Sequence, residues 1–251
     1  MALLSLRNIT KRFGGLTAVD DVSFDVGAGE LIAVVGPNGA GKTTLFNMLS
    51  GVFFPDAGRI EFDGRDMTTV PPYRRARMGL GRTFQIPRPF GSATVRENVA
   101  IGAMFGAAAS ENSVDRSMDV AEHYLDMVGL KEHRDKTGAS LTPVEKKLME
   151  IARALAMQPK LLLLDEAMAG MNPKAIDQMV ELLLAVRKQE KIAIVGLVEH
   201  IMRAVAGLAE RVIVMHHGAV LMDAPTREAL TDQRVIDVYL GRASEASDAG
   251  S

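Results

Sequence analysis

A glycine-rich segment followed by one lysine and two threonines carries the residues best suited to chemistry on a phosphate chain. Its members are Gly36, Pro37, Asn38, Gly39, Ala40, Gly41, Lys42, Thr43 and Thr44. The apolar run 31–35 before it predicts a buried strand, and residues 45–49 after it predict the start of a helix. A strand, a glycine-rich loop ending in Lys-Thr and a helix form the context that a phosphate-binding loop requires.

Each part of this segment has a physical role in binding a nucleotide. Glycines let the backbone bend so that its N–H groups point at the phosphates, and the following helix adds its positive N-terminal end. Lys42 is expected to reach the β- and γ-phosphates, and the Thr43 hydroxyl to bind Mg²⁺. A glycine-rich turn that binds nothing is the alternative, which the correct register of the Lys-Thr pair disfavours.

A second chemical site is predicted where four leucines, residues 161–164, run into two acids. The leucines indicate a strand buried on both faces, and ligands of α/β proteins bind at the carboxyl ends of such strands. Asp165 is therefore expected to hold Mg²⁺ through water, and Glu166 to act as general base on the attacking water. The alternative is that both acids are solvated residues at the start of a loop. The presence of a phosphate-binding loop disfavours this alternative.

Two further side chains are candidates for contact with a nucleotide. His200 follows the apolar run 192–198, and we expect it to contact the γ-phosphate. Phe13 is predicted in a turn, where it either stacks on an adenine ring or packs as an edge-strand core residue; composition does not favour one over the other. The remaining histidines are interpreted as structural: His123, His133, His216 and His217.

The elements that must position these residues change in character along the chain. Residues 3–35 alternate short apolar runs with Gly and Asp turns, which is typical of strands, whereas residues 90–157 are rich in Ala and Met with helical spacing. The last helix of this stretch is predicted to begin at Thr142, with Pro143 and Glu145 completing a capping box. Further on, 173–190 predicts an amphipathic helix and 212–222 a hairpin.

Composition bounds the classes of protein to which the chain can belong. Its 251 residues are 47% hydrophobic and 24% charged with a net charge of −2, so it is globular and no nucleic-acid partner is expected. The basic run 74–77 is interpreted as a solvated helix face. The lack of cysteine excludes disulfides and thiolate metal sites. Since no apolar run spans a bilayer and the first residues turn polar early, we expect a cytosolic chain.

With these motifs placed, the chain resembles the ATP-binding subunit of an ABC transporter over about residues 3–241. Five motifs occur in the family's order: the Walker A loop at Gly36–Thr43, the Q-loop glutamine Gln85, a signature-like segment from Leu141 into 150–155, Walker B at Leu161–Asp165 followed by Glu166 at the catalytic glutamate, and His200 at the switch histidine. Phe13 stands where the family has its adenine-stacking aromatic residue.

The resemblance implies an α/β fold, with a P-loop NTPase (RecA-like) core, an N-terminal antiparallel β-subdomain and an inserted α-helical subdomain. The core and β-subdomain would comprise residues 1–86 and 158–241, the helical subdomain 87–157, and a disordered tail 242–251. ATP and Mg²⁺ are the implied cofactors. By the same resemblance Gln85 joins Glu166 and His200 as a catalytic residue and joins Thr43 and Asp165 at the metal.

The segments 81–87, 94–99, 169–173, 198–200 and 234–241 further resemble the branched-chain amino-acid importer branch of this family. That branch implies membrane-spanning permease subunits and a second ATP-binding subunit as partners, and a solute-binding protein as an indirect one. The expected location is the cytoplasmic face of the cell membrane, as a peripheral subunit. Rival interpretations are a soluble ABC-type ATPase and a regulatory nucleotide-binding module that is not coupled to transport.

One departure from the family pattern concerns the signature, usually L-S-G-G-Q and here residues 141–145. Thr142 keeps a hydroxyl for nucleotide binding, but Pro143 has no N–H, Val144 adds bulk and Glu145 adds negative charge. Asn172 likewise replaces a common aspartate. We therefore hypothesise an asymmetric dimer, in which this chain's Walker A loop, Glu166 and His200 work with a partner's signature.

Overall fold

The computed structural model describes residues 2–109, 113–197, 205 and 207–240, which fall into two compact units. The first unit consists of Met1–Thr69 and Val195–Ser251, and the second of Val70–Ile194. The predicted helical subdomain, 87–157, is contained within the second unit. The predicted tail, 242–251, lies outside the described residues.

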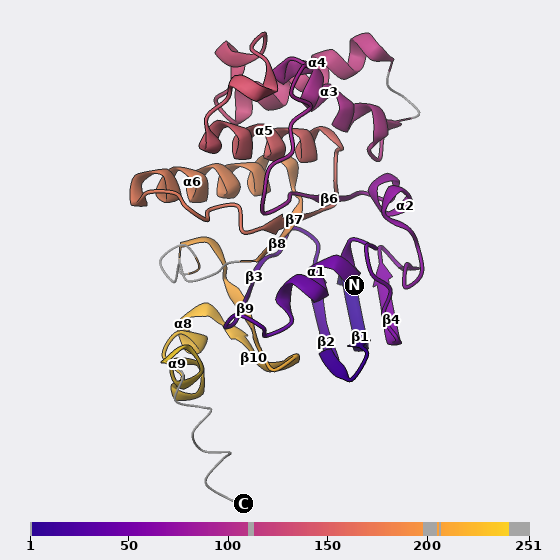
Figure 1. Cartoon of the computed structure of the whole chain (residues 1–251), viewed down its shortest axis with the longest axis vertical. Helices are drawn as coiled ribbons and strands as arrows, with labels where there is room; N and C mark the ends of the chain where they lie inside the picture. Colours follow the sequence, from indigo (N-terminus) through magenta and orange to yellow (C-terminus); the bar gives the residue numbers. More distant parts are fainter. Residues whose placement is uncertain (1, 110–112, 198–204, 206, 241–251) are drawn as a thin grey trace, which may run out of the picture. The chain divides into compact units, whose positions relative to one another are not determined.

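An antiparallel sheet of order β2-β1-β4-β5 forms one part of the first unit (Figure 1). Its strands are β1 (Ala2–Phe13), β2 (Leu16–Gly27), β4 (Ala57–Phe62) and β5 (Arg65–Asp66). Alternate residues such as Leu4 and Leu6 are fully buried, as period-two patterning requires. The short runs predicted here are continuous in two 12-residue strands, so Phe13 ends β1 instead of lying in the turn.

A second group of strands in the first unit carries the phosphate-binding loop. The strand β3 (Leu31–Val35) pairs in parallel with β9 (Arg211–His216), which pairs antiparallel with β10 (Ala219–Pro225). Every residue of β3 is buried, which confirms the predicted core strand. Helix α1 (Lys42–Leu49) follows the loop, and α8 (Thr226–Ala229) and α9 (Gln233–Leu240) follow β10.

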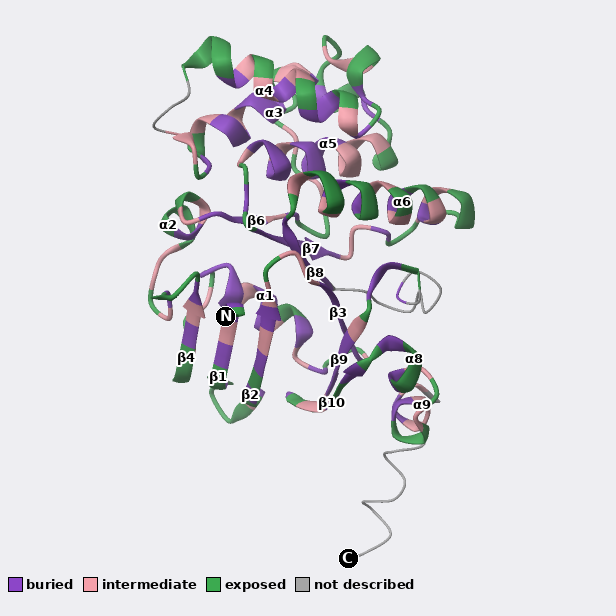
Figure 2. Ribbon diagram, turned by 180° about the vertical axis from the view of Figure 1, so that it is seen from behind, coloured by how far each residue is buried: buried purple, intermediate pink, exposed green. Residues whose placement is uncertain are grey.

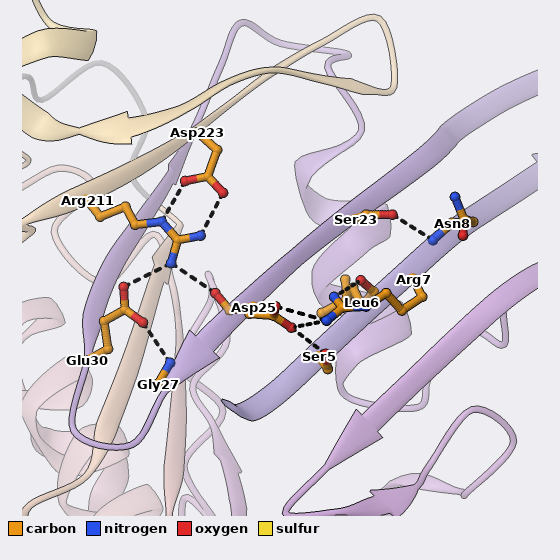
Figure 3. A network of polar contacts seen from close by, with 10 residues as sticks. All are labelled: Ser5, Leu6, Arg7, Asn8, Ser23, Asp25, Gly27, Glu30, Arg211 and Asp223. Atoms are coloured by element: carbon orange, nitrogen blue, oxygen red, sulfur yellow. Dashed lines mark hydrogen bonds and ion pairs between the residues drawn. The ribbon is translucent and has the colours of Figure 1, made fainter. Parts of the chain in front are cut away.

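The Arg211 side chain connects this group to the antiparallel sheet (Figure 3). Its guanidinium donates to both carboxylate oxygens of Asp223 at 2.5 and 2.6 Å, and to Oε1 of Glu30 at 3.0 Å. It also donates to the Asp25 carbonyl of β2 at 3.0 Å. The hydrogen bonds that Arg211 donates to Asp223, and then to Glu30, raise its pKa. One cation therefore joins β9, β10, β2 and the turn before β3.

The second unit is mainly helical. Its helices are α2 (Pro72–Arg77), α3 (Val95–Phe105), α4 (Val114–Met127), α5 (Pro143–Ala156) and α6 (Pro173–Glu190), with 3-10 turns η2 (Lys131–His133) and η3 (Gly138–Ser140). Helix α3 packs against α4 and α5. The capping box predicted at Thr142 is present, and a second one at Thr94 begins α3. The predicted 173–190 helix is confirmed as α6.

Two parallel strands of the second unit carry the acid pair. Strand β6 (Leu80–Arg82) pairs with β7 (Leu161–Asp165), and every residue of β7 is buried (Figure 2). Strand β8 (Ala193–Leu197) begins in this unit. Strand β6 ends at Arg82, and the next residue still pairs with β7, since the Thr83 N–H donates to the Leu163 carbonyl at 2.9 Å. Among the described residues, no helix is long and apolar enough to cross a membrane.

Candidate functional site

The phosphate-binding loop leaves β3 and enters α1 in the first unit, as the sequence predicts. The Lys42 ammonium group donates to the carbonyls of Gly36 and Pro37, each at 2.8 Å, and the residue is 3% exposed. Thr43, the predicted Mg²⁺ ligand, is exposed. The lysine therefore stabilises its own loop through two hydrogen bonds. The threonine at the helix start faces solvent, where a metal-bound nucleotide could reach it.

Backbone packing explains why the loop needs glycine at position 41. Gly41 has φ = +95°, and a Cβ added there would lie 2.3 Å from the Ala18 carbonyl oxygen. Gly39 also has positive φ (+80°), but a Cβ there would meet no atom within 4 Å. Position 41 therefore requires glycine both for its conformation and for a close approach, whereas position 39 requires it for conformation alone.

The turn of the β9–β10 hairpin supports the loop from behind. The Gly218 N–H donates to the Ala40 carbonyl at 3.2 Å, and the Gly218 carbonyl accepts from the Asp20 N–H at 2.8 Å. His216 and His217 precede this glycine with ring centroids 3.9 Å apart. Burial, and then the neighbouring His217, lower the pKa of His216. These contacts agree with a structural role for the two histidines.

Phe13 lies at the end of β1 and keeps 43% of its surface exposed. Its ring makes an edge-to-face contact with Phe53 at a centroid distance of 5.3 Å. The Lys11 ammonium group lies 5.5 Å from the same centroid. The ring is thus held by an aromatic and a cationic neighbour and still presents surface on which a base could stack.

In the second unit, Asp165 at the end of β7 is held by an arginine of the adjacent strand β6. The Arg82 guanidinium lies 2.8 Å from Oδ2 of Asp165, with side-chain exposures of 8% and 6%. The Asp165 N–H also donates to the Thr83 hydroxyl at 3.2 Å. One carboxylate oxygen of Asp165, which the sequence predicts to hold Mg²⁺ through water, is therefore already paired.

Glu166 is held through both its backbone and its carboxylate. Its φ of +46° is unusual for a residue with a side chain. Its carbonyl accepts from the Ala169 N–H at 3.1 Å, and its Oε2 accepts from Nε2 of Gln85 at 2.7 Å. The structure thus brings together Gln85 and Glu166, two residues that the sequence predicts to be catalytic.

The altered signature forms a well-capped helix start. The Thr142 hydroxyl accepts from the Glu145 N–H at 3.3 Å, and the Glu145 carboxylate accepts from the Thr142 N–H at 2.7 Å. His133 Nδ1 lies 3.0 Å from the same carboxylate. The hydrogen bond from the Thr142 N–H is the largest influence on the pKa of Glu145, which is lowered. The segment therefore keeps a negative charge at the helix start.

Asn172 has an equally local role at the start of α6. Its side-chain oxygen accepts from the Ala175 N–H at 2.9 Å and caps the helix. Asparagine and aspartate are comparable at this position of a helix. Replacement of the family's aspartate by asparagine therefore preserves the cap.

The predicted site residues are divided between the two units. Residues 36–44 and Phe13 belong to the first, whereas Gln85, Thr142, Asp165 and Glu166 belong to the second. His200 lies outside the described residues. Within the part of the chain that the structure describes, no cluster of three or more His, Cys, Asp or Glu side chains could by itself hold a metal ion.

Sequence reasoning missed two contacts of the acid pair. The sequence marks Arg82 only as part of the segment 81–87, because its pairing with Asp165 depends on β6 lying beside β7. Lys147 donates to the Ala169 carbonyl at 2.7 Å and to the Glu166 carbonyl at 3.3 Å, and no sequence signal marks it among the lysines of its helix.

Two features define the chain as a P-loop nucleotide-binding protein. One is the glycine loop that Lys42 contacts, between a buried strand and a helix, and the other is the acid pair at the end of a second buried strand. The model of the ABC transporter family matches residues 19–169, a stretch that contains both features.

Similar proteins extend this match to nearly the whole chain. The chain is 34% identical to the high-affinity branched-chain amino acid transport ATP-binding protein BraF of Pseudomonas aeruginosa, covering 96% of this chain and 98% of BraF. It is 35% identical to the corresponding protein LivG of Escherichia coli K12, with the same coverage. The ADP conformation of an ATP-binding cassette of an ABC transporter superposes with a TM-score of 0.84 at 30% identity, covering 96% and 99%.

The cassette cbiO1 of Clostridium perfringens, described as part of the transporter complex cbiONQ, superposes with a TM-score of 0.82 at 27% identity, covering 98% and 99%. The chain belongs to the ABC transporter family, in which it is an ATP-binding subunit with ATPase activity. This also confirms the fold class predicted from the sequence.

Proposed function

We propose that the chain is the ATP-hydrolysing motor subunit of a membrane importer for branched-chain amino acids or related small solutes. The observation that carries this proposal is its similarity, over 96% of its length, to proteins named for branched-chain amino acid transport. The regulatory alternative is not favoured, because an acid at the catalytic position is present and is held in place by Gln85.

In this proposal ATP binds with Mg²⁺, and each site residue has a separate task. The loop 36–44 holds the phosphates, with Lys42 on the β- and γ-phosphates and Phe13 stacked on the adenine. Thr43, Gln85 and Asp165 are the residues assigned to the metal. The metal ion would neutralise charge on the phosphates. Glu166 takes a proton from the attacking water. His200 would contact the γ-phosphate.

The domain organisation that goes with this proposal follows the family. Residues 1–86 and 158–241 would form the ATP-binding core with its β-subdomain, 87–157 the helical signature subdomain, and 242–251 a disordered tail. In the second unit, α3, α4 and α5 pack on one another, which supports a helical subdomain built around them.

We further propose that the motor is an asymmetric dimer with a second ATP-binding subunit. The signature of this chain would be the weaker of the two, because Pro143 has no N–H to donate and Glu145 remains negative beside an incoming phosphate. Val144 is 37% exposed at the helix start, where a glycine would permit close approach. Thr142, whose hydroxyl already caps α5, would be the residue left to contact nucleotide.

The proposed assembly includes membrane-spanning permease subunits, which the chain would meet at the cytoplasmic face of the membrane. A solute-binding protein would act through the permease. Similarity to a cassette described as part of a transporter complex supports such an assembly.

Uptake into vesicles tests this function. Vesicles containing the permease subunits, the second ATP-binding subunit and this chain are loaded with Mg·ATP, and uptake of radiolabelled leucine is followed in the presence of the solute-binding protein. We expect uptake that requires this chain and is lost with Glu166→Gln. ATP hydrolysis without uptake of leucine or any related small solute would overturn the transport proposal.

A further inference from the structure

A lysine on the signature helix contacts the turn that carries the proposed general base. Lys147 lies on α5 (Pro143–Ala156), five residues after Thr142. Its Nζ donates to the Ala169 carbonyl at 2.7 Å and to the Glu166 carbonyl at 3.3 Å. All of these residues belong to the second unit. One side chain therefore bridges α5 and both ends of the turn that follows β7.

This turn has a conformation that needs external support. Glu166 adopts φ = +46°, and a residue with a side chain in the left-handed region is held there by its surroundings. The Ala169 N–H donates to the Glu166 carbonyl at 3.1 Å, which closes the turn. Lys147 adds a cation on the same carbonyl and on that of Ala169. Charge-assisted hydrogen bonds are stronger than neutral ones, so this contact stabilises the turn.

The side chain of Glu166 is held by Gln85, which donates to its carboxylate at 2.7 Å. The backbone of Glu166 is thus fixed by Lys147 while its carboxylate is oriented by Gln85. Burial lowers the pKa of Lys147, while the charges of Glu166 and Glu150 act in the opposite direction. The lysine is partly withdrawn from water because it lies over this turn.

We propose that Lys147 is a positioning residue for ATP hydrolysis, which fixes the turn presenting the Glu166 carboxylate and links it to the helix that begins at Thr142. The proposal rests on the assigned role of Glu166 as general base. Five residues of α-helix span about 7.5 Å, so a displacement of the helix start that Thr142 forms would be passed to the turn over a short, rigid path. Contact of the altered signature with a partner would in this way reach the catalytic carboxylate.

Steady-state ATPase and nucleotide binding of the full chain test the proposal. Lys147→Met keeps the length of the side chain and removes its N–H donors, and Lys146→Met is the matched control one position earlier on α5. Lys147→Arg retains donors. We expect kcat to fall by about ten- to hundred-fold in Lys147→Met, because a general base displaced by about 1 Å loses activity on this scale.

Further readouts separate positioning from simple structural support. The Kd for ATP of Lys147→Met should stay within about twofold of the wild type, since a loop in the other unit binds the phosphates. Lys147→Arg should recover part of kcat, and Lys146→Met should retain it. In a Glu166→Gln background, Lys147→Met should lower the residual rate no further, because both changes act through the same carboxylate.

Two results would overturn the inference. One is a kcat of Lys147→Met within about twofold of that of Lys146→Met. The other is a residual ATPase rate that Lys147→Met lowers in the Glu166→Gln background by the same factor as in the wild type. Loss of activity in Glu166→Gln with normal activity in Lys147→Met would remove only this inference. Full activity in Glu166→Gln would remove the role of Glu166, and with it the proposed mechanism.

Discussion

Replacing Arg82 with methionine should destabilise the protein strongly, because it leaves the Asp165 carboxylate buried without its cation. The two side chains are 8% and 6% exposed and their charged atoms are 2.8 Å apart. Breaking a buried ion pair by removal of one partner costs about 3–5 kcal/mol. The guanidinium also lies 5.0 Å from the Phe84 ring centroid, a contact whose loss adds about 0.5–1 kcal/mol.

This magnitude is large enough for thermal and denaturant unfolding to measure. For chains of this size each kcal/mol shifts Tm by about 2–4 °C, so the combined loss of about 3.5–6 kcal/mol in Arg82→Met should lower Tm by about 7–24 °C. Unfolding in urea, followed by far-ultraviolet circular dichroism, gives the free energy directly. Arg59→Met is the matched control, because the Arg59–Glu61 pair is 57% and 40% exposed and should contribute less than about 1 kcal/mol.

The double variant Arg82→Met, Asp165→Leu distinguishes an unpaired buried charge from simple loss of packing. When both partners of a buried pair become apolar, stability is often close to that of the parent. The double variant should therefore recover most of the stability that Arg82→Met loses. A double variant as unstable as Arg82→Met, or an Arg82→Met no less stable than Arg59→Met, would refute the reasoning.

Three further predictions concern the loop, a buried acid and the signature helix. Gly41→Ala should weaken ATP binding, measured by calorimetry, much more than Gly39→Ala, because both changes strain a residue of positive φ but only the Cβ at position 41 would lie 2.3 Å from a carbonyl oxygen; equal loss in both would contradict this account. Burial of Glu150, which is 3% exposed, raises its pKa, so the folded chain holds that proton more tightly than the unfolded chain and ionisation costs stability as pH rises from about 4. The stability of Glu150→Gln relative to the wild type should therefore improve between about pH 4 and pH 7 in urea unfolding, and an unchanged difference would be inconsistent with a raised pKa. Thr142→Ala should cost about 1 kcal/mol of stability while Thr142→Ser costs little, because a hydroxyl caps α5; equal loss in both variants would exclude the cap as the cause.

Local sequence patterns were enough to predict the elements that carry the site. The apolar run 31–35, the four leucines before Asp165 and the capping box at Thr142 each produce the expected structure, because each is decided by neighbouring residues. Strands β1 and β2 of the antiparallel sheet extend further than predicted. Backbone pairing with β1 continues past the apolar positions, and polar residues at an edge do not interrupt it.

Contacts between distant residues were not predictable from the sequence. Arg82 and Asp165 are 83 positions apart, and their pairing depends on β6 lying beside β7. Lys147 and Ala169 meet because α5 passes over the turn after β7, which no periodicity in either segment encodes. The positive φ of Glu166 also escapes prediction, since glutamate has no preference for that region.

The measurement that most directly tests the central claim is steady-state ATPase of the purified chain, alone and mixed with candidate second ATP-binding subunits, with Glu166→Gln as the paired control. The account predicts slow turnover of the chain alone, faster turnover with one partner, and loss of that turnover in Glu166→Gln. Fast turnover alone would contradict the asymmetric dimer. ATP binding without turnover in any mixture, or turnover unchanged by Glu166→Gln, would contradict the account of this chain as an ATP-hydrolysing motor.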